Sequence, residues 1–465
     1  MIRVFSQYVS LKSLLLIAVE SAVIVLSLGL GAKLRFWNDP AEFLLYAGSG
    51  SFLLQVLTVL IVLEICCYYN SLYDLSVVRP RREQFLCLAQ ALGAGCLVLG
   101  FLYCLIPGLL VGRGVLFIAL VLTTGIISTL RIGLDWAWRL TAREHRVLIL
   151  GDGEIALTTS RELERRVDLN FRVAGFVTSD RTRYNELLRH PVLGDKSELR
   201  AIAREQRISK IIVALDDLRG ALPTRDLVQL RVQGIEIEDA HSALAALTGR
   251  VWLRPVRPSW FVFSKGFERS KTTMLLKRVI DLAFALVGIV LFSPIIVLVA
   301  GAIRLDSKGP VFYRQARVGF TGRVFNVLKF RSMQVDAEDG TGAQWSQNDD
   351  PRITRLGRYL RKYRLDELPQ FLNVIRGEMS FVGPRPERPC FVEQLREQIP
   401  FYDERHSVRP GITGWAQVEY KYGASIEDAF HKLEYDLFYL KHLSIVFDIA
   451  IVFRTVRVVL LGFGR

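Results

Sequence analysis

Four long apolar stretches occupy the first 135 residues of the chain, and they restrict its fold more than any other feature. Each reaches the roughly 20 residues that a helix needs to cross a bilayer. They run approximately over Leu14–Leu34, Phe43–Tyr68, Phe85–Val111 and Val115–Ile132. A cleaved signal peptide does not explain the first, because no small-residue cleavage site followed by a soluble domain accompanies it. We predict a four-helix transmembrane bundle over residues 1–140.

Lysine and arginine residues around these stretches predict their orientation, because cytoplasmic loops of membrane proteins are enriched in both. Three flanking segments are basic: they contain Arg3, Lys12, Arg79, Arg81, Arg82, Arg131, Arg139, Arg143 and Arg146. The alternate loops carry only Lys33, Arg35 and Arg113. Both ends of the bundle are therefore expected in the cytoplasm. Glu20 lies inside a predicted span, and the sequence offers it no obvious basic partner.

The remainder of the chain is more polar, so the overall composition is a mixture. Hydrophobic residues make up 51% of the 465 residues and charged residues 23%, which excludes both a disordered chain and a purely soluble enzyme. The net charge of +14 suggests an anionic partner such as nucleic acid, lipid headgroups or a phosphorylated substrate. No nucleic-acid recognition motif accompanies this charge, so we do not expect nucleic acid.

Short β-rich runs alternate with helical segments from Arg146 onward, a rhythm typical of βαβ units and a parallel sheet. The first run ends in a G-x-G-x-x-A turn at Gly151–Ala156, where glycines could let a pyrophosphate approach a helix N-terminus. No Tyr-x-x-x-Lys follows, as a dehydrogenase or epimerase would use. We predict a Rossmann-like, nucleotide-binding-type domain over residues 141–255, with a structural or regulatory role and nucleotide binding both left open.

A fifth apolar stretch, Val279–Ile303, is long enough to span a bilayer, but two features oppose a straight crossing. Basic residues flank both of its ends: Lys277, Arg278, Arg304 and Lys308. Ser293-Pro294 interrupts its middle, where a proline removes a helical hydrogen bond and bends the helix. We predict a re-entrant membrane helix over residues 274–305, within a membrane-associated α/β catalytic domain at 256–465.

Two strands are expected near the start of that domain, at Val311–Arg314 and Val324–Met333. Period-2 alternation places Lys329 and Arg331 on one strand face. Two cations on one face suit a substrate phosphate, although a solvated sheet edge gives the same pattern.

A basic amphipathic helix with apolar residues at Ile353, Leu356 and Leu360 precedes the run Leu365–Gln370. Asp366 in this run could simply cap a helix. A carboxylate beside Arg361 and Arg364 could equally act as a nucleophile towards phosphorus. The adjacent Glu367 offers the hard oxygen ligand that Mg²⁺ prefers.

Two downstream loops add candidate residues. Gly383-Pro384-Arg385-Pro386 holds an arginine in an extended loop, which limits the entropy lost when Arg385 binds phosphate. Pro410–Gln417 is punctuated by glycines, and it suits contact with a base or sugar through Gly411, Thr413, Gly414 and Gln417. An ordinary turn around a packed Trp415 explains the second loop as well.

These motifs together closely resemble the bacterial sugar transferase family, the polyprenyl-phosphate hexose-1-phosphate transferases also called monotopic phosphoglycosyl transferases. Their order and spacing match across roughly Lys271–Arg465, through Lys329–Met333, Leu365–Gln370, Gly383–Pro386 and Pro410–Gln417. The preceding bundle and Rossmann-like domain resemble the long-form members. Met1–Leu16 is similar to the subgroup that accompanies exosortase/PEP-CTERM systems.

The resemblance implies a two-step transfer from a UDP-sugar. Asp366 would attack the β-phosphate, release UMP and form a covalent phosphosugar intermediate, which polyprenyl (undecaprenyl) phosphate would then attack. Glu367 would bind Mg²⁺, and Arg361 and Arg385 would neutralise phosphate oxygens. In the re-entrant helix, Lys277 and Arg278 would lie where the lipid phosphate meets the membrane interface. Ser293-Pro294 would correspond to the helix break of the family.

The resemblance places the protein in the bacterial inner membrane, with a cytoplasmic catalytic domain that starts exopolysaccharide or O-antigen synthesis. Expected partners are the UDP-sugar, polyprenyl phosphate, membrane lipid, a second copy in a homodimer and other polysaccharide-assembly proteins. Two alternatives are a Rossmann-type oxidoreductase or epimerase acting on nucleotide sugars and a non-enzymatic membrane scaffold.

Overall fold

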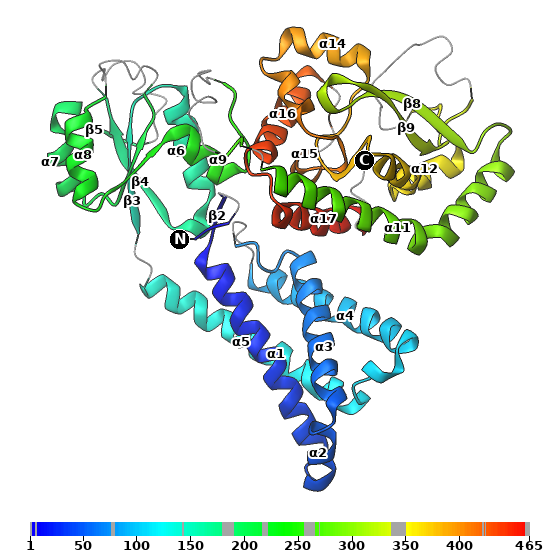
Figure 1. Cartoon of the computed structure of the whole chain (residues 1–465). Helices are drawn as coiled ribbons and strands as arrows, with labels where there is room; N and C mark the ends of the chain where they lie inside the picture. Colours follow the sequence, from blue (N-terminus) through cyan, green and yellow to red (C-terminus); the bar gives the residue numbers. More distant parts are fainter. Residues whose placement is uncertain are drawn as a thin grey trace. The chain divides into compact units, whose positions relative to one another are not determined.

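The computed structural model describes residues 2–4, 7–75, 80–141, 144–178, 190–215, 222–254, 266–268, 270–335, 350–420, 423 and 425–460. The chain forms two compact units, Met1–Ala243 and Leu244–Arg465. The first unit contains apolar helices and a parallel sheet (Figure 1). The second contains the dyad Asp366-Glu367.

The N-terminal apolar stretches form long helices, which confirms the prediction of several apolar helices there. They are α1 (Leu11–Arg35), α3 (Gly50–Tyr69), α4 (Arg81–Leu105) and α5 (Arg113–Thr141), with a short α2 (Pro40–Ala47) before α3. Among the described residues, these four long helices and α11 (Lys271–Asp306) are long and apolar enough to cross a membrane. α1 packs along α5, and α3 packs along α4.

A buried ion pair supplies Glu20 with the basic partner that the sequence did not make obvious. Glu20 is fully buried, and its two carboxylate oxygens accept hydrogen bonds from Arg131 Nε at 2.6 Å and Nη2 at 3.0 Å. The two residues lie 111 positions apart on α1 and α5, which is why the local sequence did not reveal the pair. Glu64 on α3 accepts hydrogen bonds from Ser21 and Tyr73, so it too has partners within the bundle.

A short hairpin, β1 (Ile2–Val4) and β2 (Gln7–Val9), precedes α1 and binds the parallel sheet of the same unit. The Tyr8 hydroxyl donates to Glu238 at 2.6 Å and accepts from Lys210 Nζ at 2.5 Å. Lys210 is 3% exposed and also donates to Glu236. The hairpin that precedes α1 is therefore attached to the sheet by a buried polar cluster.

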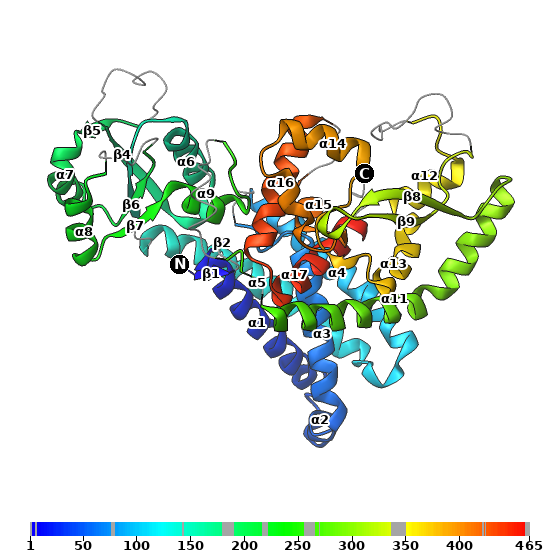
Figure 2. The same cartoon turned by 45° about the horizontal axis from the view of Figure 1, so that its top comes forward.

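The sheet has five parallel strands in the order β5-β4-β3-β6-β7, with bounds Val192–Gly194, Phe171–Val177, His145–Leu150, Lys210–Val213 and Glu236–Asp239. Helices α7 (Leu199–Glu205) and α8 (Thr224–Val232) cover one face and α6 (Glu154–Arg165) the other (Figures 1 and 2). This confirms the Rossmann-like prediction. Gly151 has φ +129°, and a Cβ there would lie 2.2 Å from Ala214 O.

The second unit is built on α11, which continues through Pro294 and is visibly bent (Figures 1 and 2). Its strands form two pairs: antiparallel β8 (Phe312–Val318) with β9 (Val324–Phe330), and parallel β10 (Ser380–Val382) with β11 (Gly411–Thr413). The remaining elements are α9 (Ala240–Thr248), whose last residues belong here, η4 (Phe320–Gly322), α12 (Arg355–Lys362), η5 (Leu365–Gln370), α13 (Phe371–Arg376), α14 (Pro389–Gln398), η6 (Tyr402–Ser407), α15 (Trp415–Glu419), α16 (Ile426–Lys441) and α17 (Ile445–Leu460).

Two apolar clusters join β9 to α11. Val327 packs with Ala285 and Phe371, whereas Phe330 packs with Val299 and Ile303. Val327 and Phe330 lie on opposite faces of the strand and thus reach different parts of α11, and they hold the strand that carries Lys329.

Candidate active site

The dyad lies on η5, a tight 3₁₀ turn between α12 and α13. Arg364 adopts a left-handed conformation, φ 53°, just before the turn, and no side chain caps it. Asp366 therefore does not act as the helix cap that the sequence also allowed. Asp366 and Glu367 are each 7% exposed. Burying two adjacent carboxylates is costly unless cations compensate their charge.

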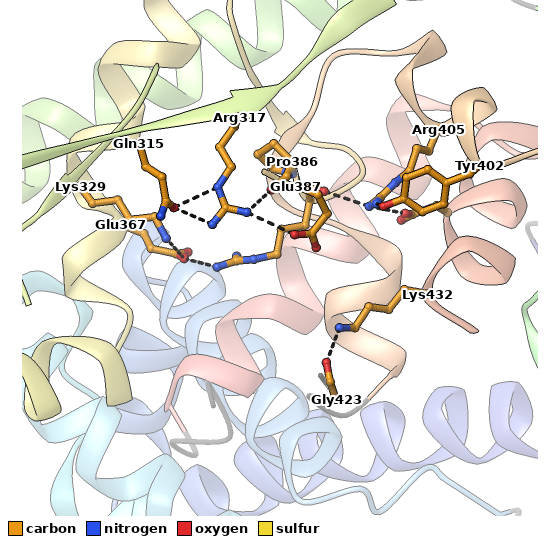
Figure 3. A network of polar contacts seen from close by, with 12 residues as sticks. Gln315, Arg317, Lys329, Glu367, Pro386, Glu387, Tyr402, Arg405, Gly423 and Lys432 are labelled. Carbon is orange, nitrogen blue, oxygen red and sulfur yellow. Dashed lines mark hydrogen bonds and ion pairs between the residues drawn. The ribbon is translucent and has the colours of Figure 1, made fainter. Parts of the chain in front are cut away.

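Three cations surround Glu367. Its Oε1 accepts from Arg385 Nη2 at 2.8 Å and from Lys329 Nζ at 3.4 Å (Figure 3). Its Oε2 lies 3.6 Å from Arg364 Nη1. Burial alone raises the pKa of this carboxyl, but the opposing charges of Arg385, Lys329 and Arg364 prevail and hold it well below its ordinary value. Glu367 is therefore ionised at neutral pH.

Asp366 has the opposite electrostatic balance. Burial, and then repulsion by the Glu367 charge, raise its pKa to about 6, against the attraction of Lys329, Arg361 and Arg385. It is mainly ionised at neutral pH and less strongly solvated than a surface carboxylate. Burial also lowers the pKa of Lys329.

Backbone hydrogen bonds fix the loop that carries Arg385 at three consecutive carbonyl oxygens. Arg405 Nη2 donates to Arg385 O, Arg317 Nη1 donates to Pro386 O, and the amide of Val318 donates to Glu387 O, each at 2.9 Å. Figure 3 shows Arg317 beside Pro386 and Glu387, with Glu367 and Lys329 close by. The extended loop is therefore held from β8 and η6.

The Pro410–Gln417 loop packs against this loop, which changes the role expected for its glycines. A Cβ on Gly414 would lie 2.2 Å from Gly383 O, and one on Gly411 would lie 2.1 Å from Gly383 N. Gly411, Thr413 and Gly414 are buried, and Thr413 bonds Thr455 at 2.7 Å. These residues pack against the backbone of Gly383 and so support the loop that carries Arg385. Gln417 is half-buried, and its Oε1 has no hydrogen-bond partner among the described residues.

Arg331 differs from the expectation of a phosphate-binding side chain. Its guanidinium donates to Lys308 O at 2.9 Å and to Ser307 O at 2.8 Å, just beyond the last turn of α11. Arg331 therefore binds the residues that follow α11, because it follows β9 and no longer shares the strand face of Lys329. The sequence alternation did not reveal where the strand ends.

The predicted lipid-phosphate residues at the start of α11 are engaged with protein groups. Lys277 is 5% exposed and donates to Asp448 at 2.6 Å and to Val382 O at 3.0 Å. Arg278 donates to the carbonyls of Val374 and Ile375 at the end of α13. These contacts attach α11 to the domain, and the buried ammonium of Lys277 does not face an interface. Ser293 and Pro294 are exposed, and the Ser293 hydroxyl bonds Val290 O within the helix.

Sequence reasoning missed the residues that hold the site together. Arg317, Arg405, Asp436 and Asp448 belong to no recognised motif, and their partners lie between 20 and 171 residues away. Among these residues, only Asp448 carries a sequence signal: an aspartate within an apolar helical pattern indicates a buried charge that needs a partner.

The donor chemistry at the dyad fits Mg²⁺ with the help of a substrate. Asp366 and Glu367 offer hard carboxylate oxygens, and Mg²⁺ usually takes one or two of these together with phosphate oxygens and water. Among the described residues, no group of three His, Cys, Asp or Glu side chains could hold a metal by itself.

Comparisons with known proteins identify the family of the chain. The family model described as "Bacterial sugar transferase" matches residues 272–462, and a "CoA-binding domain" model matches residues 69–231. A UDP-glucose:undecaprenyl-phosphate glucose-1-phosphate transferase of Escherichia coli is 35% identical over 340 residues, which cover 71% of this chain and 70% of the relative. The chain belongs to the bacterial sugar transferase family.

Other members of this family match in different proportions. A UDP-N-acetylgalactosamine-undecaprenyl-phosphate N-acetylgalactosaminephosphotransferase of Aeromonas hydrophila is 41% identical over 60% of this chain and 66% of its own length. An exopolysaccharide production protein of Rhizobium leguminosarum is 41% identical over 39% of this chain and 94% of its own length. The chain spans between 58% and 70% of the lengths of three long relatives.

Proposed function

We propose that this protein transfers a hexose 1-phosphate from a UDP-sugar to polyprenyl phosphate and releases UMP, and so starts exopolysaccharide or O-antigen synthesis. The observation that carries the proposal is the buried Asp366-Glu367 pair, surrounded by cations within the matched domain. The names of the relatives support glucose or N-acetylgalactosamine as the sugar, with undecaprenyl phosphate as the acceptor.

In the first step, a carboxylate oxygen of Asp366 attacks the β-phosphorus of the UDP-sugar. The bond from this phosphorus to the bridging oxygen breaks, and UMP leaves with the electron pair. The raised pKa of Asp366 supports its role as the nucleophile, because a partly desolvated carboxylate is a stronger nucleophile than a solvated one.

In the second step, a phosphate oxygen of the polyprenyl phosphate attacks the same phosphorus. The bond to Asp366 breaks, its carboxylate is restored, and polyprenyl-diphosphate-sugar leaves. Both steps move negative charge between phosphate oxygens, so fixed cations stabilise both transition states.

Arg385, Lys329, Arg361 and Arg364 are the cations available for that purpose. The Nε of Arg364 is buried and has no hydrogen-bond partner among the described residues. A phosphate oxygen would satisfy this donor. Mg²⁺ bound by Glu367, with Asp366 adjacent, would supply further positive charge to the diphosphate.

The contacts of α11 support a re-entrant membrane attachment. Arg278 near its start binds α13, Gly288 near its middle contacts Phe371, and the residues after its end bind Arg331. A straight helix of 36 residues would be about 54 Å long, so one cytoplasmic domain could not hold both ends across a bilayer. We propose that α11 enters one leaflet and returns, and that α1, α3, α4 and α5 span the inner membrane.

The decisive experiment measures UMP release by the purified full chain from UDP-glucose and UDP-N-acetylgalactosamine, with undecaprenyl phosphate present. A sugar-dependent release that Asp366→Asn abolishes is the expected result. Without lipid, the wild type should retain labelled phosphosugar on Asp366. Sequential kinetics and no adduct would overturn the covalent mechanism, while bound NAD with oxidised sugar products would favour an oxidoreductase.

The role of Glu367 has a separate test. Glu367→Gln should remove most turnover and leave membrane association unchanged, and EDTA should reproduce the loss in the wild type. Full activity in EDTA would contradict the Mg²⁺ assignment.

A further inference from the structure

Arg405 lies behind the Arg385 loop, on η6. It is 6% exposed, and its guanidinium makes three contacts in different directions. Nη1 donates to the Tyr402 hydroxyl at 2.6 Å, and Nη2 donates to Arg385 O at 2.9 Å and lies 2.8 Å from Asp436 Oδ2. Figure 3 shows Arg405 with Tyr402, beyond Pro386 and Glu387 from the dyad side.

The partner of Arg405 is also deeply buried. Asp436 on α16 is 1% exposed. A buried ion pair contributes little net stability compared with apolar residues of the same volume, since both charges lose their hydration. The specific gain from this pair is geometric, because it fixes the direction of the guanidinium that holds Arg385 O.

We propose that Arg405, oriented by Asp436, is a positioning residue that keeps the Arg385 side chain in contact with Glu367. The inference rests on the proposed function of the dyad. The contact of Arg405 with Arg385 is made to the backbone oxygen of Arg385. The side chain of Arg385 in turn donates to Glu367 Oε1 at 2.8 Å. Arg405 therefore acts through Arg385 and does not touch the substrate.

An arginine is required at this position for a geometric reason. The planar guanidinium donates through Nη1 to Tyr402 and through Nη2 to the Arg385 carbonyl, and Nη2 also forms the ion pair with Asp436. A lysine keeps the charge that compensates Asp436, but its single nitrogen cannot reach all three partners in the same directions. Arg405→Lys should therefore fold and still lose the support of the loop.

The test is a double-mutant cycle on UMP release, with Arg405→Lys, Arg385→Ala and both together in the full chain. Arg405→Lys should lower kcat/KM by about 10- to 100-fold, as small misplacements of catalytic groups do. The decrease in kcat/KM of Arg405→Lys should come from kcat and from KM in the same proportion as the decrease in Arg385→Ala. The double variant should be no slower than Arg385→Ala, since Arg405 acts only through Arg385.

The matched control is Arg396→Lys, because Arg396 forms an ion pair with Asp403 in which both side chains are about half exposed. It should keep wild-type kinetics. Additive losses in the double variant, or an Arg405→Lys loss that only reduces the amount of folded protein, would overturn the proposal. If Arg405→Lys does not fold, Asp436→Asn undergoes the same cycle with the same deciding outcomes. A wild type that releases no UMP would instead refute the proposed function.

Discussion

Asp366 and Glu367 are neighbours in sequence with pKa values displaced in opposite directions. Both carboxyls are buried, but the cations beside Glu367 outweigh its desolvation, whereas desolvation and the charge of Glu367 prevail at Asp366. One carboxylate is therefore a permanent anion and the other a group that titrates near neutrality. This division suits a nucleophile beside a cation-binding partner.

The pH dependence of activity follows from that division. In the proposed mechanism only the ionised Asp366 attacks phosphorus, and the pKa of Asp366 is about 6. We expect kcat/KM for UMP release to fall about tenfold per pH unit well below pH 6. In Arg385→Ala the acid limb should move to higher pH, because a charge that lowers the pKa of Asp366 is lost. A pH–rate profile unchanged in that variant would contradict this assignment.

The same pKa predicts a stability effect. A carboxyl whose pKa is higher in the folded than in the unfolded state binds more protons when folded, so its contribution to stability decreases as pH rises from about 4 to about 6. Asp366→Asn should therefore melt at a higher temperature than the wild type at pH 7, while it lacks activity. Equal melting temperatures at pH 7 would show that the buried charge costs no stability.

At the scale of elements, two loops that are distant in sequence form one support. β10 and β11 pair in parallel, and Gly383, just after β10, meets Gly411 at the start of β11 and Gly414 just after its end. The glycines allow the two backbones to approach closely, and this contact fixes the position of the Arg385 loop.

Gly414→Ala tests this support, because its Cβ would lie 2.2 Å from Gly383 O and must displace the loop. We expect UMP release to fall by about 10- to 100-fold through displacement of Arg385. Gly301→Ala on α11 is the control, since a Cβ there meets nothing within 4 Å. Equal activity of both variants would show that the loop tolerates the contact.

The attachment of α11 to α17 depends on the buried pair of Lys277 and Asp448. Lys277→Met leaves an uncompensated buried carboxylate and should destabilise the domain by about 3–5 kcal/mol. Lys277→Met with Asp448→Asn should cost less than Lys277→Met alone. Thermal unfolding in detergent compares the stability of the wild type, the single variant and the double variant. A double variant less stable than Lys277→Met would contradict the role of the ion pair.

At the scale of the whole molecule, the membrane topology decides where the chemistry occurs. Single cysteines at Ser270 and Lys308, both exposed at the ends of α11, should be labelled from the cytoplasmic side in a background without the six native cysteines. Lys308 is preferred to Ser307, whose hydroxyl binds Arg331. Labelling of Lys308→Cys only from the periplasm would exclude the re-entrant helix.

The sequence by itself determined the apolar helices, the parallel βαβ sheet, the order of the motifs and the family. These features are local, because they depend on periodicity and on residues adjacent in the chain. The dyad, Lys329 and Arg385 could be named for the same reason.

Tertiary structure alone decided which charges meet. Glu20 with Arg131, Lys277 with Asp448 and Arg405 with Asp436 join residues from separate elements. A buried charge requires a partner, but the sequence does not say which distant residue supplies it. The same limit explains why Arg331 and the glycines of the Pro410–Gln417 loop were assigned to substrate: their packing partners become adjacent only when the chain folds.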